Sequence, residues 1–264
     1  FLGGALNGDS REYNELGVMT SAVTYKNNVI SGDAREYTEL GVLHAIWGYK
    51  DGQKEGISKV FHNNGQVELH LEFKGGEING NVKRFAKNGV LLLDAEYKAN
   101  QYHGMVKEFF DNGKLKSECY YVEGIKNGPC HEFYGDGKLH LEWTYKNGLK
   151  QGMAREFREN GTIWMEVSYE SNKQNGTMKE YYANGKIRRE WQILNGVQEG
   201  PSRSYYDTGE LMGEEKYLNG KLQGDARLLG RDGNIVFIDN YEQGVKRSRK
   251  GFDSRGKIDF EQKY

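Results

Sequence analysis

The side chains best able to perform acid–base or metal chemistry are scattered along this sequence without a functional spacing. None of the six histidines forms a His-Glu-x-x-His pair, and the two cysteines, Cys119 and Cys130, lack the paired Cys-x-x-Cys spacing of a zinc site. No glycine-rich loop leads into a Lys-Ser or Lys-Thr pair, and no Ser-His-Asp set stands out from the surrounding pattern. We therefore expect a protein that is not an enzyme and that holds neither a metal nor a cofactor.

Aromatic side chains are the residues best suited to recognition, because their flat apolar faces can stack on a sugar or anchor a protein partner. The candidate partner-binding residues are the four tryptophans and four rings that directly follow another aromatic residue: Trp47, Trp143, Trp164, Trp191, Phe110, Tyr134, Tyr182 and Tyr206. Most of them keep a regular spacing and could equally cover backbone on neighbouring strands. Trp164 departs most from that spacing and is the strongest functional candidate.

These residues are carried by a 24-residue repeat. A first glycine recurs at every 24th position from Gly8 to Gly224, and a second glycine follows each one nine residues later. A fixed period of this length indicates one supersecondary unit stacked into an array. We expect a single array over residues 1–264, with a partial repeat at 1–7, full repeats from 8 to about 246, and a partial repeat at 247–264. Positions are counted below from the first glycine as position 0.

Each repeat reads as a β-hairpin. Position 5 is aromatic in nearly every repeat, position 11 is aliphatic or Met, and an Asn-Gly or Asp-Gly pair usually lies between them. Asn-Gly favours a two-residue type I′ turn, whose central residues both have positive φ. That turn places position 3 opposite position 14, where opposite charges recur: Lys83 with Asp94, Lys107 with Glu118, His131 with Glu142, Arg155 with Glu166, Lys179 with Glu190 and Arg203 with Glu214. A three-residue loop with a glycine bulge would instead pair positions 5 and 11.

The connection between repeats predicts how the hairpins join. If it is symmetric about its central Gly or Asn, the position-17 tyrosines lie opposite a first glycine on both neighbouring strands, and each ring covers bare backbone. The same register places Trp191 opposite Ser202, and Cys119 opposite Cys130. Because cross-strand disulfides are strained, we expect two reduced thiols, with a disulfide as the alternative. The fold predicted is all-β: an elongated single-sheet antiparallel meander of about ten hairpin repeats.

Composition limits the partners and the environment. The 37 basic and 38 acidic residues leave a formal net charge of −1, which gives no electrostatic case for nucleic acid. No apolar run is long enough to span a membrane, and no signal-peptide pattern is present. The chain starts with Phe1 in the phase of a preceding repeat, so we expect it to be part of a longer polypeptide of bacterial cytoplasm or envelope. Open end strands would permit end-to-end self-association.

A unit such as residues 108–118, followed by Tyr121 and Gly128, resembles the bacterial variant of the MORN (membrane occupation and recognition nexus) repeat. The resemblance covers essentially the whole chain and implies a ribbon of Tyr- and Gly-rich hairpins. Members of that family include scaffolds, oligomerisation modules, proposed lipid binders and antitoxin-like proteins, and the resemblance supplies no active-site residue. The classical Tyr-x-Gly-x-Trp pattern is absent from this chain.

The function predicted is a non-enzymatic repeat scaffold that binds a protein partner or spaces other domains. One alternative is an antitoxin or immunity protein that neutralises a partner toxin. A second alternative is a surface or envelope module that binds glycan or lipid head groups.

Overall fold

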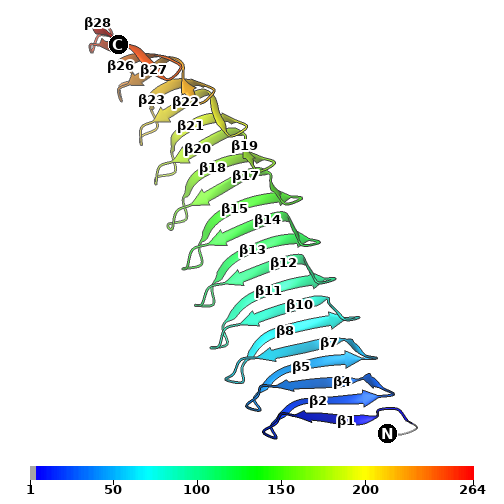
Figure 1. Cartoon of the computed structure of the whole chain (residues 1–264). Helices are drawn as coiled ribbons and strands as arrows, with labels where there is room; N and C mark the ends of the chain where they lie inside the picture. The colour runs from blue at the N-terminus through cyan, green and yellow to red at the C-terminus, as the bar shows by residue number, and fades with distance from the viewer. Residues whose placement is uncertain (1–3) are drawn as a thin grey trace. The chain divides into compact units, whose positions relative to one another are not determined.

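The computed structural model describes residues 4–264, which form antiparallel β-strands joined by tight turns (Figure 1). The chain divides into two compact units. Unit 1 comprises residues 1–128 and 135–137, and unit 2 comprises residues 129–134 and 138–264. Each unit is described by itself. The predicted all-β meander of antiparallel hairpins is confirmed.

The strands of unit 1 follow one another along the chain in pairs with short bridging strands. They are β1 (Gly8–Tyr13), β2 (Met19–Lys26), β3 (Val29–Ile30), β4 (Gly32–Tyr37), β5 (Leu43–Lys50), β6 (Gln53–Lys54), β7 (Gly56–Phe61), β8 (Val67–Lys74), β9 (Glu77–Ile78), β10 (Gly80–Phe85), β11 (Leu91–Lys98), β12 (Gln101–Phe109) and β13 (Leu115–Val122).

Strand β14 (Ile125–Phe133) includes the division between the units. The remaining strands belong to unit 2: β15 (Leu139–Lys146), β16 (Leu149–Lys150), β17 (Gly152–Phe157), β18 (Ile163–Glu170), β19 (Lys173–Gln174), β20 (Gly176–Tyr181), β21 (Ile187–Leu194), β22 (Val197–Tyr205), β23 (Leu211–Leu218), β24 (Lys221–Leu222), β25 (Gly224–Leu229), β26 (Ile235–Glu242), β27 (Val245–Phe252) and β28 (Ile258–Lys263).

The predicted pairing of positions 3 and 14 is present, and so is the alternative pairing of positions 5 and 11. Lys83 lies opposite Asp94, as expected for positions 3 and 14, but Phe85 also lies opposite Leu91, which are positions 5 and 11. Both pairings occur because a β-bulge between Arg84 and Phe85 absorbs one residue. The same shift recurs in the hairpins of both units.

The two-residue type I′ turn predicted at Asn-Gly is therefore wrong. In the turn after β10, the Gly89 N–H donates to the Ala86 carbonyl and the Ala86 N–H donates to the Val90 carbonyl. Gly89 has a φ of 82°, whereas Asn88 is not among the residues with positive φ. This is the alternative named from the sequence, a three-residue loop of residues 87–89 with a glycine bulge, and it pairs positions 5 and 11. Asn88 stabilises this turn through its side chain, because its Oδ1 accepts a hydrogen bond from the Val90 N–H.

Type I′ turns occur instead at the connection between hairpins. The central pair Ala99 and Asn100 has φ values of 49° and 64°, and equivalent pairs with two positive φ values recur along the chain. This turn pairs Tyr97 with Tyr102, so Tyr97 faces Gly80 on one side only, and the expectation of a first glycine on both sides is wrong. Gly104 occupies a bulge with a φ of 111°. A Cβ there would lie 2.1 Å from Glu96 Oε2, so this first glycine permits the kink.

Paired residues share a face of the sheet, which defines two surfaces in each unit. We call the face that carries positions 2, 13, 15 and 17 the core face, and the face that carries positions 1, 3, 14 and 16 the charged face. In unit 1 the core face holds a buried cluster of Leu71, Phe73 and Val82, against which Trp47 and Tyr97 pack. Burial on the core face therefore adds to the backbone pairing between neighbouring hairpins of unit 1.

Consecutive repeats are also joined through their turns. The backbone N–H of the second type I′ residue donates to a carbonyl 22 residues earlier, for example Asn100 to Ile78 in unit 1 and Gly196 to Gln174 in unit 2. Because each turn bonds to the one before it, the turn edge is ordered by nearest-neighbour contacts.

The expectation of two reduced thiols is wrong, because no cysteine between residues 4 and 264 is free. Cys130 is completely buried, and Cys119 is 8% exposed. Both cysteines are disulfide-bonded, which is the alternative named from the sequence, and their burial shields the bond from solvent.

Candidate partner-binding groove

Three of the candidate aromatic residues join consecutive repeats. The hydroxyls of Tyr134, Tyr182 and Tyr206 donate to the backbone carbonyls of residues 23 positions later, which are Phe157, Tyr205 and Leu229, at 2.6, 2.7 and 2.8 Å. All of these bonds lie within unit 2. Because these hydroxyls bond to the backbone of the next repeat, the three tyrosines have a structural role that phenylalanine could not fill.

We expect Tyr182→Phe to lower the free energy of unfolding by about 1 kcal/mol, because the Tyr205 carbonyl loses its donor while the ring stays in place. Urea unfolding followed by circular dichroism measures the change. Tyr13→Phe is the matched control, since the Tyr13 side chain is 57% exposed and should give no change. Equal losses in both variants would contradict the role assigned to the hydroxyl.

Two of the tryptophans are covered by lysines on the core face. The Lys54 ammonium lies 3.4 Å from the Trp47 ring centroid, and Trp47 also meets Phe73 edge-on at 6.3 Å. Burial lowers the pKa of Lys54, partly opposed by Glu36. Lys150 covers Trp143 in the same way at 4.7 Å, and Trp143 is only 9% exposed. These tryptophans are packed into their units and offer little ring surface to a partner.

The other three candidates differ in their surroundings. Phe110 is the first residue of the turn after β12, where its carbonyl accepts the Gly113 N–H. Trp191 lies opposite Ser202, as expected, and its ring is 5.3 Å from the Arg189 guanidinium. Trp164 is 38% exposed. The structure therefore leaves Trp164 as the most accessible of the four tryptophans.

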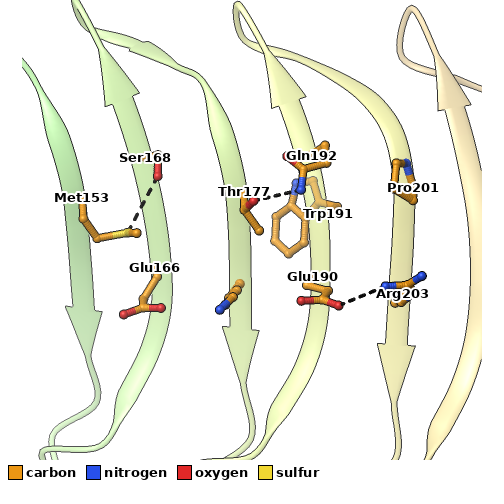
Figure 2. A pocket seen from close by; sticks show the side chains of 10 residues that line it. Met153, Glu166, Ser168, Thr177, Glu190, Trp191, Gln192, Pro201 and Arg203 are labelled. Atoms are coloured by element: carbon orange, nitrogen blue, oxygen red, sulfur yellow. Dashed lines mark hydrogen bonds and ion pairs between the residues drawn. The ribbon is translucent and has the colours of Figure 1, made fainter.

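A groove of about 500 Å³ lies on the charged face of unit 2 (Figure 2). One row of its lining carries Glu166, Lys179, Glu190 and Arg203 from four neighbouring strands. A second row carries Met153, Ser168, Thr177, Gln192 and Pro201. Trp191 also lines this groove, and none of the other seven candidate aromatics does. We call it the ladder groove.

Most carboxylates and guanidiniums of the ladder groove are fixed by their neighbours. Arg155 bridges Glu142 and Glu166 at 2.8 and 2.9 Å, and Arg203 bonds Glu214 at 2.9 Å. The Tyr181 hydroxyl donates to Glu166, and the Tyr205 hydroxyl donates to Glu190, both at 2.7 Å. The position-5 rings Tyr181 and Tyr205 thus lie beside the charged ladder.

These contacts set the ionisation of Glu166. Burial alone would raise its pKa, but hydrogen bonds from Arg155 and Tyr181 and the charge of Lys179 lower it below the ordinary value. Glu166 is therefore a stable carboxylate at neutral pH.

Lys179 differs from the other cations of the ladder groove. Its backbone lies opposite both Glu166 and Glu190, but these carboxylates turn to Arg155, Tyr181, Arg203 and Tyr205. Within residues 4–264 the Lys179 ammonium makes no hydrogen bond or ion pair. A partly buried ammonium that forms no close ion pair is available to an acidic group from outside.

The tyrosine–carboxylate bonds predict a pH dependence of stability. Burial and the bond to a carboxylate raise the pKa of Tyr181 and of Tyr205 from 10 to about 12. Their stabilising contribution is therefore complete below pH 10 and is lost as pH rises to about 12. Between about pH 9 and 11.5, the free energy of unfolding measured with urea should fall less in the double variant Tyr181→Phe, Tyr205→Phe than in the parent chain. Parallel pH profiles would contradict the assignment.

Sequence reasoning identified Lys179 and Arg203 as ladder residues but missed them as site residues. The charge pattern predicts that Lys179 is paired with Glu190, because it treats each hairpin alone. The signal that could have revealed the free ammonium is the neighbouring Arg155 and Arg203, since arginine binds carboxylates with more donors than lysine does.

Neither a metal site nor a membrane-spanning helix is found in the described part of the chain. No group of three or more His, Cys, Asp or Glu side chains in residues 4–264 is arranged to hold a metal ion. No helix in this range has the length and apolarity needed to cross a membrane.

Comparison with known proteins identifies the repeat. Five segments match the family described as MORN repeat variant: residues 54–74, 102–123, 126–147, 174–195 and 198–219. All five start at position 22, so the family unit has the phase of the 24-residue repeat. No curated protein matches the chain. One matching solved structure, titled "Crystal Structure of TcdB2-TccC3", aligns with 97% of this chain and 19% of that chain, at 14% identity and a TM-score of 0.18. This chain spans about a fifth of that one, and so low a score supports no conclusion.

Proposed function

We propose that this chain, five segments of which match the variant MORN repeat, is a non-enzymatic interaction module whose ladder groove binds an acidic segment of a protein partner. The observation that carries the proposal is the unpaired Lys179 ammonium between two fixed carboxylates. An incoming carboxylate would pair with Lys179, while the Glu166 and Glu190 carboxylates favour donors on either side of it. The groove thus favours an extended segment of alternating charge.

The absence of catalysis is part of the same proposal. Beside the charged ladder, Tyr181 and Tyr205 have pKa values of about 12, so both hydroxyls stay protonated and bonded to carboxylates well above neutral pH. Their partners Glu166 and Glu190 are engaged by arginines. Groups held in this way stabilise a rigid surface and are poorly suited to exchange protons with a substrate.

The experiment is affinity capture on the immobilised chain, followed by calorimetry with the purified partner. We expect Lys179→Glu to weaken binding by about 30-fold or more, and rising salt to weaken binding to the parent chain. Lys173→Glu is the matched control, because it makes the same charge change at an exposed residue of strand β19 in the same unit. Equal affinities of the parent and Lys179→Glu chains would overturn the assignment of the groove.

The purified partner also distinguishes an antitoxin role from a scaffold role. If the partner arrests growth when produced alone, and coexpression of this chain restores growth, the module acts as an antitoxin. If the partner is harmless, the scaffold role holds.

A further inference from the structure

The core face of unit 2 changes character towards its C-terminal repeats. Positions 13 and 15 are Leu69 and Leu71 in unit 1, where they pack in the buried cluster. Their counterparts in β23 are Gly213 and Glu215, and position 15 in β26 is Asp239. The apolar packing of the repeat is therefore replaced by a glycine and two carboxylates, which a purely structural repeat has no reason to place there.

These replacements leave a hollow of about 500 Å³ in the core face of unit 2. Its floor is made by three small residues: Ser204 lies opposite Gly213, and Ala226 lies opposite Asp239 on the next pair of strands. In unit 1 the counterparts of Ser204 and Gly213 are Val60 and Leu69, which fill the same space with side chains. We call this concavity the polar hollow.

Ion pairs fix the charged walls of the polar hollow. Arg249 binds both oxygens of Asp239, at 2.7 and 2.8 Å, and Lys246 lies 2.9 Å from the same carboxylate. On the opposite side, Arg189 donates to Glu215 at 2.8 Å and to the Ser202 hydroxyl at 3.2 Å. Because each guanidinium has five N–H donors, both arginines keep further donors for a ligand.

The remaining lining offers rings and free hydroxyls. Phe237, Tyr217 and Tyr241 line the hollow, and the Arg249 guanidinium lies 4.5 Å from the Phe237 ring. Within residues 4–264, neither the Ser204 nor the Tyr241 hydroxyl makes a hydrogen bond to protein. The polar hollow thus combines unpartnered hydroxyls, spare guanidinium donors, carboxylate lone pairs and aromatic rings.

We propose that the polar hollow binds one residue of a neutral saccharide. An anion would meet Glu215 and Asp239, and a cation would meet Arg189 and Arg249, so balanced walls disfavour either charge. A pyranose carries hydroxyls that both donate and accept, and its C–H face can lie on an aromatic ring. The volume also suits a ligand of this size. Gly213, Glu215 and Asp239 of this site are on the core face, and the proposal does not depend on the partner of the ladder groove.

Saturation-transfer NMR on the full chain tests the proposal. The probes are glucose, galactose, mannose and N-acetylglucosamine, with glucuronate as an anionic comparison and glucosamine as a cationic one. We expect at least one neutral sugar to bind with a dissociation constant of about 1–10 mM and both charged sugars to bind less well. No transfer to any neutral sugar at about 10 mM, or tighter binding of a charged sugar, overturns the proposal.

Substitutions in the polar hollow test whether saccharide binding occurs there. Ala226→Leu should abolish binding by filling the floor, and the double variant Ser204→Ala, Tyr241→Phe should weaken it about ten-fold by removing two hydroxyls. The double variant deletes only hydroxyls, so it keeps the test decisive if Ala226→Leu fails to fold. Lys173→Ala, at an exposed residue outside both concavities, is the control that leaves binding unchanged. Unchanged binding in the double variant, or a loss in Lys173→Ala alone, overturns the location.

Discussion

Leu71→Ala should lower the free energy of unfolding of unit 1 by about 2–3 kcal/mol. Leu71 is 8% exposed and packs with Phe73 and Val82. The loss combines the lost burial with the cavity left in a thin core that contains few other aliphatic side chains. Urea unfolding followed by circular dichroism measures the change.

The matched control for this prediction is Leu40→Ala. Leu40 is 88% exposed in a turn of the same unit, so the identical chemical change should alter stability by less than about 0.5 kcal/mol. If both variants lost the same stability, the leucine side chains would be acting through something other than packing on the core face.

Asp239→Ala should destabilise unit 2 by about 2–3 kcal/mol at neutral pH. Removing the carboxylate leaves Arg249 and Lys246 facing each other without their shared counter-ion, and the Asp239 side chain is only 13% exposed. Asp207→Ala is the control, because its pair with Arg231 is on the surface and more than half exposed on both sides. That variant should show no resolvable change.

The Asp239 effect should also depend on pH. Hydrogen bonds from Arg249 outweigh burial and hold the pKa of Asp239 below its ordinary value of 3.8. A lowered folded-state pKa means that the contribution is present above 3.8 and is lost as pH falls through the folded-state value. The difference between the parent chain and Asp239→Ala should therefore shrink in strong acid. A difference that stayed constant into strong acid would contradict the assigned ion pair.

The sequence by itself determined the repeat, its phase and its charge register. Glycine at position 0 and the pairing of Lys83 with Asp94 follow from local rules that hold inside one hairpin: turn formation, strand alternation and cross-strand charge. For the same reason the sequence located the structural partner of Trp191 at Ser202. These features depend on residues within about one period of each other, where periodicity carries the information.

Only the tertiary structure decided how the hairpins close and which groups stay unpaired. Asn-Gly pairs are compatible with two turn geometries, and the choice depends on the bulge that the neighbouring strand accommodates, as at Arg84 and Phe85. Tyr182 became a link between repeats because the next repeat places a carbonyl within reach. Lys179 has no close ion pair because the arginines of adjacent repeats bind the neighbouring carboxylates instead. The polar hollow likewise depends on which side chains of adjacent repeats meet. Both outcomes depend on distances between repeats, which the sequence pattern does not contain.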